Sequence, residues 1–380
     1  MILAHATFWI AAGLVVYTYL GYALLLWLLP GWRRADVSAG ETVPTVTMVI
    51  AAYNEERFIH DKVKNALAVR YPEGRYNVVV VSDGSADATN DIVREFDDER
   101  LTFIALDERG GKANALNNAL RVVDTDLVVF TDANVFLDPD AIEALAAVFA
   151  DPATGAVTGR VELESIEENE PLGEGAYMRY ERLLQSLESD YWSVAGVDGA
   201  LFAARRSLVD ELPPDTVLDD FTLGVNVALA GFRVRYEPRA SAVEQVPAEV
   251  AQEFRRKTRI AAGSFQMLSR LPRPAFRAAP ARFRFAFLSH KLLRWYVPFL
   301  LVVILLSNLV LLPQPVYALT LAGQLGIYGA ALLAHLVPGL RQSGVFYVPY
   351  YFTAMNLALM VGWFRHRRNQ QSVTWSRVDR

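Results

Sequence analysis

Two apolar runs in the sequence each end in an aspartate, and these two carboxylates are the first candidates for chemistry. The valines of residues 78–81 lead through Ser82 into Asp83, and residues 127–131 lead into Asp132. A continuous apolar run of this length is typical of a strand that is buried on both faces of a parallel sheet. Ligands of such sheets bind just beyond the carboxyl ends of the strands. The two aspartates therefore indicate a polar ligand, and one that carries phosphate and a metal ion suits them best.

Two further segments have features of phosphate binding. Residues 51–56 (Ala-Ala-Tyr-Asn-Glu-Glu) end a strand and begin a helix, whose first N–H groups favour an anion, and Tyr53 offers a ring on which a base can stack. A capped helix start is the structural alternative. Residues 110–112 (Gly-Gly-Lys) open another helix but lack the spacing and the hydroxyl of a P-loop. We therefore expect Lys112 to contact a diphosphate or its neighbouring acids.

Two pairs of polar residues extend this set. Asp132 and Asn134 can share one divalent cation whose remaining ligands are phosphate oxygens and water. Asp219 and Asp220 can supply a general base for a hydroxyl nucleophile. Each of these residues also has a purely structural explanation. The first pair can form an Asx turn, and the second pair can cap a helix. Asp83 can shape a strand-to-helix turn.

The charged residues limit the partners. Residues 255–259 (Arg-Arg-Lys-Thr-Arg) form a basic cluster that can neutralise a diphosphate leaving group or attract anionic lipids. The 380-residue chain has a net charge of −5, and its basic residues gather next to apolar segments, which argues against a nucleic-acid partner. The chain has no cysteine, so disulfides and thiolate metal sites are excluded.

Apolar segments near both ends indicate an integral membrane protein. No Lys, Arg, Asp or Glu occurs in residues 1–32 or 295–340, and about 20 apolar residues suffice for a helix to cross a bilayer. The first segment has no basic start and a long apolar core, so we expect an uncleaved anchor rather than a signal peptide. The predicted spans are residues 7–29, 295–312, 315–337 and 345–364.

Basic residues next to these spans predict the orientation. Arg33 and Arg34 follow the first span, which by the positive-inside rule places the middle of the chain in the cytoplasm. The basic tail from Arg365 to Arg368 indicates the same side, yet three C-terminal crossings would leave it outside. We expect one of the later segments to be re-entrant or interfacial, and the number of crossings stays open. The predicted units are an anchor (1–32), a cytoplasmic domain (41–271), an interfacial, amphipathic connection (272–294), a C-terminal membrane region (295–364) and a basic tail (365–380).

Strands and helices alternate along the first half of the soluble domain. The predicted strands are 46–51, 77–81, 101–106 and 127–131, and the predicted helices are 55–68, 86–96, 112–122 and 140–149. Such units predict a parallel sheet with helices on both faces. The elements expected in the second half are strands at 156–162 and 232–236, an acidic loop at 164–174, and helices at 177–193, 218–230 and 250–268.

In this order the motifs resemble those of the membrane-embedded family 2 glycosyltransferases, the superfamily that includes cellulose, chitin and hyaluronan synthases. The resemblance covers about residues 44–268. The motifs that carry it are residues 52–56, 82–85, 111–117, 132–134, 218–220 and 256–260. It implies an α/β fold of the GT-A type that binds a nucleotide-diphospho-sugar on the cytoplasmic face, flanked by transmembrane helices. It also implies an Mg²⁺ or Mn²⁺ cofactor and a nucleotide-sugar donor, with a UDP-sugar favoured.

The resemblance implies a role for each matched residue. The residues implied on the donor side are Ala52, Tyr53, Glu55, Asp83, Lys112 and Asp132. Those implied on the acceptor and diphosphate side are Asp198, Gly199, Asp219, Arg256 and Arg259. Asp132 and Asn134 match the metal site, and Asp220 matches the catalytic base. The base would deprotonate an acceptor hydroxyl, which would displace the nucleoside diphosphate with inversion.

Three departures from the family pattern narrow the expected product. Asn134 replaces the second aspartate of the metal motif, Asp219 replaces a glutamate, and Ile260 replaces the tryptophan in the signature of the processive synthases. That tryptophan stacks on an acceptor sugar, so we expect the addition of one or a few sugars to a membrane-associated or exported glycan or lipid. The alternatives are a processive synthase that secretes its polymer through its own helices, and a non-catalytic scaffold of an export complex.

Overall fold

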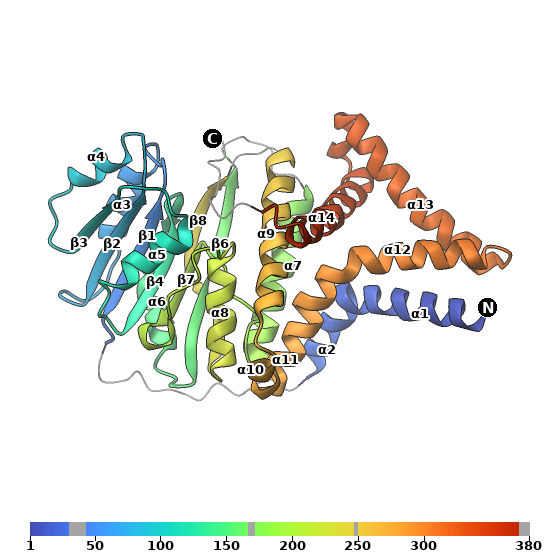
Figure 1. The fold of residues 1–380 in the computed structure, drawn as a ribbon, viewed down its shortest axis with the longest axis horizontal. Coiled ribbons are helices and arrows are strands. Elements are labelled where there is room, and N and C mark those ends of the chain that lie inside the picture. Colours follow the sequence, from blue (N-terminus) through green and yellow to red (C-terminus); the bar gives the residue numbers. More distant parts are fainter. Residues whose placement is uncertain (30–42, 166–171, 247–249, 372–380) are drawn as a thin grey trace.

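The computed structural model describes residues 1–29, 43–165, 172–246 and 250–371. An α/β domain is joined to a set of long helices that extend away from it (Figure 1). The domain contains one mixed eight-stranded sheet with the strand order β3-β2-β1-β4-β7-β6-β8-β5. The strands are β1 (Val46–Ala52), β2 (Tyr76–Asp83), β3 (Leu101–Leu106), β4 (Leu127–Asp132), β5 (Val135–Leu137), β6 (Thr154–Ser165), β7 (Leu201–Arg205) and β8 (Arg233–Val246).

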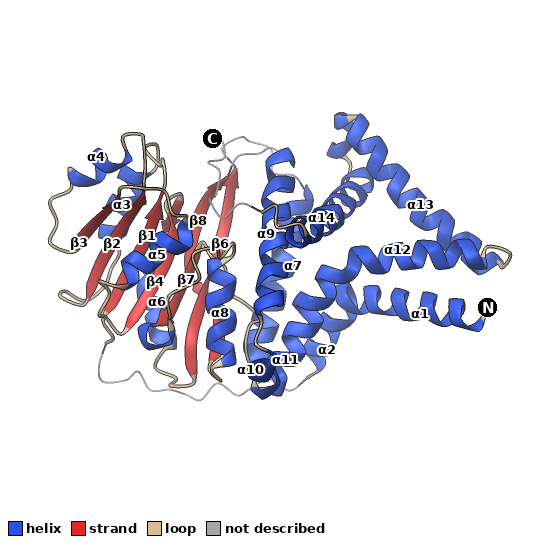
Figure 2. Cartoon of the chain, viewed as in Figure 1, coloured by secondary structure: helices blue, strands red, loops and turns tan. Residues whose placement is uncertain are grey.

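Helices cover both faces of this sheet (Figure 2). The helices of one face are α3 (Ile59–Leu67), α4 (Thr89–Arg94) and α6 (Ala141–Val148), and those of the other are α5 (Lys112–Leu120) and α8 (Asp219–Leu229). Successive residues of a buried strand face opposite cores, so Val79 packs on the side of α5 and Val80 on the side of α3. The predicted arrangement of helices on both faces is confirmed.

The remaining helices connect the domain to the membrane-type region. They are α1 (Ile2–Val16), α2 (Tyr22–Leu28), α7 (Leu172–Tyr191), α9 (Val250–Arg270), α10 (Arg273–Ala278), α11 (Ala281–Ala286), α12 (Leu293–Leu311), α13 (Pro315–Leu336) and α14 (Gly344–Arg367). Short π-helical turns occupy Tyr17–Gly21 and Phe287–Leu292, and 3₁₀ turns occupy Arg206–Leu208 and Pro338–Gln342.

The four strands of the first half, β1 to β4, pair in parallel as predicted, whereas the second half of the sheet is mixed. β7 runs antiparallel to both β4 and β6, and β5 runs antiparallel to β8. The sequence does not predict β5 or β7, because strands of 3 and 5 residues are too short to show a period. β8 extends over 14 residues, well beyond the predicted strand at 232–236, because it pairs with β6 along its length. Partners that are distant in sequence therefore decide the direction and length of these strands.

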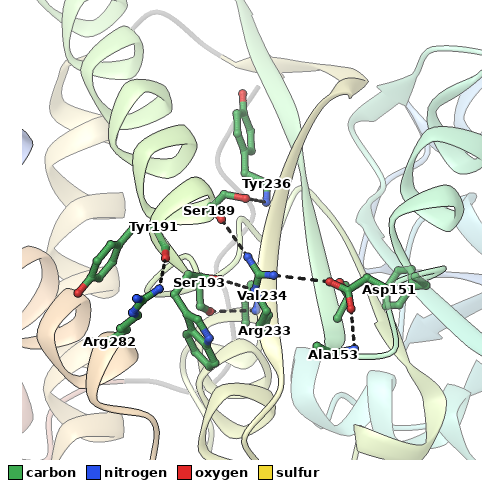
Figure 3. A network of polar contacts seen from close by, with 12 residues as sticks. Asp151, Ala153, Ser189, Tyr191, Ser193, Arg233, Val234, Tyr236 and Arg282 are labelled. Atoms are coloured by element: carbon green, nitrogen blue, oxygen red, sulfur yellow. Dashed lines mark hydrogen bonds and ion pairs between the residues drawn. The ribbon is translucent and has the colours of Figure 1, made fainter. Parts of the chain in front are cut away.

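The C-terminal end of α7 is fixed to the sheet by a buried arginine. Figure 3 shows Arg233 of β8 between α7 and the loop before β6. Its Nε donates to the carbonyl oxygen of Trp192 at 2.7 Å, and its guanidinium lies 3.6 Å from a carboxylate oxygen of Asp151. On the other side of α7, Nη1 of Arg282 donates to the carbonyl oxygen of Tyr191 at 3.2 Å. The sheet, α7 and α11 are thus joined at one place.

Four helices in the described part of the chain are long and apolar enough to cross a membrane. They are Ile2–Leu28, Ala281–Leu311, Pro315–Leu336 and Gly344–Arg367. Each predicted span overlaps one of them. The second begins at Ala281 rather than at residue 295, because α11, a π-helical turn and α12 follow one another without a break. α1 and α12 lie side by side and point away from the sheet (Figure 1).

The last helix returns to the domain. α14 packs along α9, and Gly362 permits the close approach, because a Cβ at that position would lie 2.8 Å from the carbonyl oxygen of Thr258. The basic end of α14, from Arg365 to Arg367, therefore lies near α9, and its predicted cytoplasmic side stays a prediction. Arg33 and Arg34, and the tail from residue 372, lie outside the described residues.

Candidate active site

Three adjacent strands bring the predicted donor residues to one edge of the sheet. β1 lies between β2 and β4, and Ala51 pairs in register with Asp132. Asp83 ends β2 and Asp132 ends β4, so the two carboxylates flank the loop that follows β1. Ala52 is the buried last residue of β1, and Tyr53 is the first residue of that loop. The predicted clustering at the carboxyl ends of the strands is therefore present.

Asp83 organises the glycine turn that opens α5. Its side chain is fully buried, and its two carboxylate oxygens accept hydrogen bonds from the backbone N–H groups of Gly110 and Gly111, each at 2.8 Å. Gly84 has a φ of +66°, and a Cβ there would lie 2.8 Å from the backbone nitrogen of Arg109. Only glycine suits this conformation and this spacing. The predicted contact of Asp83 with a base or ribose stays a prediction, whereas its hold on the turn is direct.

The loop after β1 is bonded to the loop after β2. Asn54 has a φ of +54°, and its backbone N–H donates to Oγ of Ser85 at 3.0 Å. The side-chain oxygen of Asn54 accepts from the backbone of Ala86 at 2.8 Å, and Glu55 donates its backbone N–H to Oγ1 of Thr89 at 2.8 Å. These bonds hold residues 54–58 in a turn, so α3 begins at Ile59 and not at residue 55 as the pattern predicts.

The ring of Tyr53 is covered by an arginine that sequence reasoning missed. The guanidinium carbon of Arg109 lies 3.7 Å from the centre of the Tyr53 ring. A cation over an aromatic face is favourable, and it occupies a face that the sequence assigns to a base. The sequence feature that could have revealed Arg109 is its position directly before the Gly-Gly-Lys segment. The sheet topology brings this segment beside Tyr53.

Lys112 joins two of the predicted carboxylates. Its ammonium nitrogen lies 2.6 Å from Oδ1 of Asp132 and 3.5 Å from Oδ2 of Asp219. Burial alone would lower the pKa of Lys112, but Asp132, Asp219 and Asp220 outweigh burial and raise that pKa. The lysine is therefore always charged. It lies between the carboxyl ends of β1, β2 and β4, which we call the donor edge, and the start of α8. Its contacts are with neighbouring acids, as predicted.

Asp220, the predicted base, has a raised pKa. Burial and the neighbouring Asp219 raise the pKa of Asp220 to about 7, against the opposing influence of Lys112. One carboxylate oxygen accepts the backbone N–H of Phe221 at 2.7 Å. The other lies where a Cβ on Gly199 would be only 2.4 Å away, so the loop can pass Asp220 only because residue 199 is glycine. A base with a pKa near neutrality suits proton transfer at physiological pH.

The predicted acceptor-side residues differ in their relation to Asp220. Asp198 precedes Gly199 and raises the pKa of Asp220 by repulsion, a smaller effect than burial. Arg259 on α9 donates from Nη1 to the carbonyl oxygen of Val217 at 3.4 Å, so it supports the segment that leads into the base. Arg256 instead bonds with Glu253 on its own helix at 2.8 Å.

Of the two predicted metal ligands, Asp132 and Asn134, the structure favours Asp132. The carboxylates of Asp132 and Asp219 already approach a common cation, the ammonium of Lys112. Among the described residues no three His, Cys, Asp or Glu side chains form a metal cluster. The side-chain nitrogen of Asn134 donates to the carbonyl oxygen of Gln245 at 3.1 Å, which ties this amide to β8. Mg²⁺-type sites often use one or two carboxylates plus substrate phosphates, and Asp132 suits that role.

A buried lysine behind Asp132 is the second residue that sequence reasoning missed. Lys62 of α3 is fully buried, and its ammonium donates to Oγ1 of Thr131 at 3.1 Å and to the carbonyl oxygen of Val135. Burial lowers the pKa of Lys62 to about 7, and Asp132 opposes this shift. Lys62 thus ties together the residues on either side of the Asp-Ala-Asn turn. The sequence feature that could have revealed Lys62 is its position on the apolar face of α3, next to Val63.

Transfer of a sugar from a nucleotide needs a cation beside the leaving diphosphate, a base for the acceptor hydroxyl and an anchored loop for the nucleoside. The edge of this sheet brings Lys112, Asp220 and the loop after β1 together. The fold and the site therefore define an enzyme of the nucleotide-sugar-dependent glycosyltransferase class with a GT-A-like α/β domain.

Comparison with known families gives the particular family. The family model described as "Glycosyltransferase like family 2" matches residues 44–263, and the chain belongs to this family. The predicted family and the predicted α/β fold class are confirmed, with a sheet that is mixed rather than parallel.

Relatives in sequence include poly-beta-1,6-N-acetyl-D-glucosamine synthases. The protein of Staphylococcus aureus (strain COL) is 28% identical over 247 residues, which are 63% of this chain and 58% of the relative. The protein of Staphylococcus epidermidis is 26% identical over 242 residues, which are 61% of this chain and 58% of the relative. The match therefore spans little more than half the length of these curated relatives.

A solved structure resembles the chain over nearly its whole length. This is the mannosyltransferase PcManGT from Pyrobaculum calidifontis in complex with GDP-Man and Mn²⁺, with a TM-score of 0.73 and 25% sequence identity. The superposition covers 97% of this chain and 99% of the other. The likeness includes the helices outside the α/β domain as well as the domain itself.

Proposed function

We propose that this glycosyltransferase moves a single hexose from a nucleoside-diphosphate donor to a hydroxyl of a membrane-associated or exported glycan or lipid, with inversion at the anomeric carbon. The observation that carries the proposal is the position of Lys112, 2.6 Å from Asp132 and 3.5 Å from Asp219. The ammonium of Lys112 also acts electrostatically on Asp220, and the pKa of Asp220, about 7, suits a general base.

In this proposal Asp220 accepts the proton of the acceptor hydroxyl. The acceptor oxygen forms a bond to the anomeric carbon, while the bond from that carbon to the nucleoside diphosphate breaks and the diphosphate keeps the electron pair. Lys112 stabilises the charge that develops on the diphosphate, since a preorganised cation is most effective where charge appears in the transition state. A divalent cation held by Asp132 would supply further electrostatic stabilisation at the diphosphate.

The donor is proposed as a nucleotide hexose, and its base is an open choice between two classes. The sequence favours a UDP-sugar, while the relative in the solved structure is a mannosyltransferase in complex with GDP-Man. A thermal-shift screen of the purified full chain with UDP- and GDP-sugars, each with and without Mn²⁺, tests both. We expect one donor to raise the melting temperature only when Mn²⁺ is present. If no nucleotide sugar stabilises the protein, the proposal is wrong.

The anomeric configuration and the length of the product test whether transfer inverts and whether it adds a single sugar. Proton NMR of the newly formed linkage reports its anomeric configuration, and a product with the donor's configuration would exclude direct displacement. The length distribution of the product, measured by mass spectrometry, distinguishes one or a few additions from polymerisation.

A processive synthase is the second candidate, and the names of the curated relatives favour it. Ile260 argues against it, because it stands where processive relatives of the family carry a tryptophan, and it packs against the hydrophobic core under α8. A polymer of high mass from the purified protein would decide for this second candidate.

We also propose that the α/β domain faces the cytoplasm. The basic end of α14 lies beside this domain, and positively charged segments are retained on the cytoplasmic side. Cysteines introduced at Arg94 and Arg365, labelled from either side of sealed membrane vesicles, are expected to react from the same side.

A further inference from the structure

A cavity of about 360 Å³ lies where the soluble domain meets the first helix of the C-terminal membrane region. It is bounded by the end of α9, by α10 and by the π-helical turn that precedes α12. Its apolar wall consists of Leu268, Leu271, Phe276, Phe287, Leu288 and Leu292. A volume in this range is typical of small-molecule sites, and none of the predicted donor or acceptor residues lines it.

Two arginines add positive charge to this otherwise apolar cavity. Arg273 and Arg277 both line it, and both are exposed. They are four residues apart on α10, so they lie on one side of that helix. In the described part of the chain neither guanidinium has a carboxylate partner, whereas the preceding Arg270 bonds with Asp215. Two unpaired guanidinium groups beside one cavity suit a phosphate, which arginine binds through paired hydrogen bonds.

The position of the cavity indicates where such a phosphate comes from. Leu288 and Leu292 belong to the first, charged part of the continuous helix Ala281–Leu311, directly before the charge-free stretch that begins at Trp295. Leu288 remains 40% exposed. A free phosphate would leave this apolar wall in water, whereas a lipid would cover it with an acyl chain. We propose that the cavity binds an anionic phospholipid, with its phosphodiester at Arg273 and Arg277 and an acyl chain along the leucines.

The cavity also adjoins the segment that carries the base. Phe287 of the cavity wall is buried, and its ring centre lies 6.4 Å from that of Phe221 in a stacked arrangement. Phe221 follows Asp220 and donates its backbone N–H to the Asp220 carboxylate. A bound lipid that packs on Phe287 therefore supports the start of α8. We infer that the lipid increases transfer activity, and this second step rests on the proposed role of Asp220.

Binding is tested on the full chain without any need for turnover. The protein is reconstituted in nanodiscs of phosphatidylcholine with a small fraction of phosphatidylglycerol, and the lipid that stays bound after transfer to detergent is counted by native mass spectrometry. We expect phosphatidylglycerol to be retained in preference to phosphatidylcholine. The double variant Arg273→Gln/Arg277→Gln is expected to reduce this retention about tenfold, because each arginine near an anionic lipid contributes separately.

Two matched variants distinguish the site from a general effect of charge. Arg70→Gln/Arg94→Gln removes the same charge from exposed positions of the soluble domain and is expected to leave retention unchanged. Leu288→Trp keeps both arginines but fills the cavity from an exposed position, and it is expected to reduce retention as well. Lipid retention is thus reduced in two independent ways, so the proposal can still be tested if one variant folds poorly.

Several results would overturn the proposal. These are equal retention of the two lipids by the wild-type protein, and retention by Arg273→Gln/Arg277→Gln equal to that of the wild type. Displacement of phosphatidylglycerol by an equal concentration of a polyprenyl phosphate would assign the cavity to a lipid-linked acceptor instead. If binding is as expected but transfer is equally fast in both lipids, the lipid site stands and the link to Asp220 is wrong. If no transfer occurs at all, the proposed function fails independently of the lipid site.

Discussion

The donor edge of the sheet and the membrane-facing side of the domain are stabilised in different ways. At the donor edge, short loops are held by backbone hydrogen bonds, as Asp83 holds Gly110 and Gly111. On the membrane-facing side, buried charges hold helices together. Glu181 of α7 pairs with Arg294 and with His290. The first kind of contact joins loops that are about thirty residues apart, whereas the second joins segments that are more than a hundred residues apart.

A single carboxylate illustrates the second kind of contact. Glu188 of α7 is fully buried. It accepts hydrogen bonds from Tyr22 in the N-terminal helix at 2.7 Å and from the backbone N–H of Ala195 at 3.0 Å, and it lies 2.8 Å from Nδ1 of His290. Ala195 opens the loop that passes Asp220 at Gly199. The membrane-type helices are therefore connected to the loop that passes Asp220, while the carboxyl ends of β1, β2 and β4 are organised within the sheet.

The largest expected effect comes from the base. Asp220→Asn removes the proton acceptor while it keeps the size of the side chain and the contact with Gly199, so transfer should fall about 10³-fold. The donor-induced shift in melting temperature should remain, because Asp220 does not hold the nucleotide in this proposal. Asp210→Asn, at an exposed position, is the control. Full activity of Asp220→Asn would show that Asp220 is not the base.

The same residue sets an expected pH dependence. The pKa of Asp220 in the folded protein is about 7, above its ordinary value of 3.8, so the transfer rate should rise as pH increases through 7. For stability the sign is opposite. The folded state favours the protonated carboxyl, so the contribution is complete below about pH 4 and is lost as pH rises through about 7. Asp220→Asn should therefore raise the melting temperature at pH 8 and change it little at pH 4. The reverse ranking would contradict the raised pKa.

The next effect tests the membrane-facing side. Burial alone would raise the pKa of Glu181, but Arg294 and His290 outweigh burial and lower that pKa well below its ordinary value. Glu181→Gln leaves the guanidinium of Arg294 without its charged partner, so the free energy of unfolding should fall by about 3 kcal/mol. Thermal melts of the full chain measure this, with the exposed Glu143→Gln as the control. A loss of donor binding without a loss of stability would break the distinction between the two sides.

A smaller effect is expected at the buried lysine behind the donor edge. Lys62→Met removes the hydrogen bonds to Thr131 and Val135 that fix the turn of Asp132, so the affinity for Mn²⁺ should weaken about tenfold. The electron paramagnetic resonance signal of free Mn²⁺ reports this without turnover. Lys64→Met on the exposed face of the same helix is the matched control. Equal Mn²⁺ affinity in the two variants would mean that Lys62 serves the fold alone.

The smallest effect is expected at Arg109. Its guanidinium lies over the ring of Tyr53, and such contacts contribute modestly at partly exposed sites. Arg109→Ala should raise the donor KM about threefold and leave kcat nearly unchanged, because only the support of Tyr53 is lost. Steady-state kinetics with varied donor measure this, and Arg70→Ala serves as control. A fall in kcat with an unchanged KM would place Arg109 in the chemistry instead of the donor pocket.

The sequence predicts the parallel part of the sheet well, because the signal for its strands is local. Apolar runs that end in Asp83 and Asp132 indicate parallel strands, and parallel strands bring their ends together. Lys62 and Arg109 escape this reasoning, because their importance depends on which helix or loop lies opposite them. The antiparallel β7 and the long β8 escape it for the same reason, since their partners are remote in sequence. The ion pairs of α7 are not predicted by any periodic pattern in the sequence, because their partners are more than a hundred residues away.

The packing of α14 on α9 has a consequence for shortened versions of the protein. Gly362 lies against the backbone of α9, and α9 carries Arg259, which contacts the segment leading to Asp220. A chain cut in the turn before α14 would keep every motif by which the family is recognised, yet it would lose the helix that backs the acceptor side. A gene fragment with all the signature residues can therefore encode a domain that lacks the packing of α14 on α9.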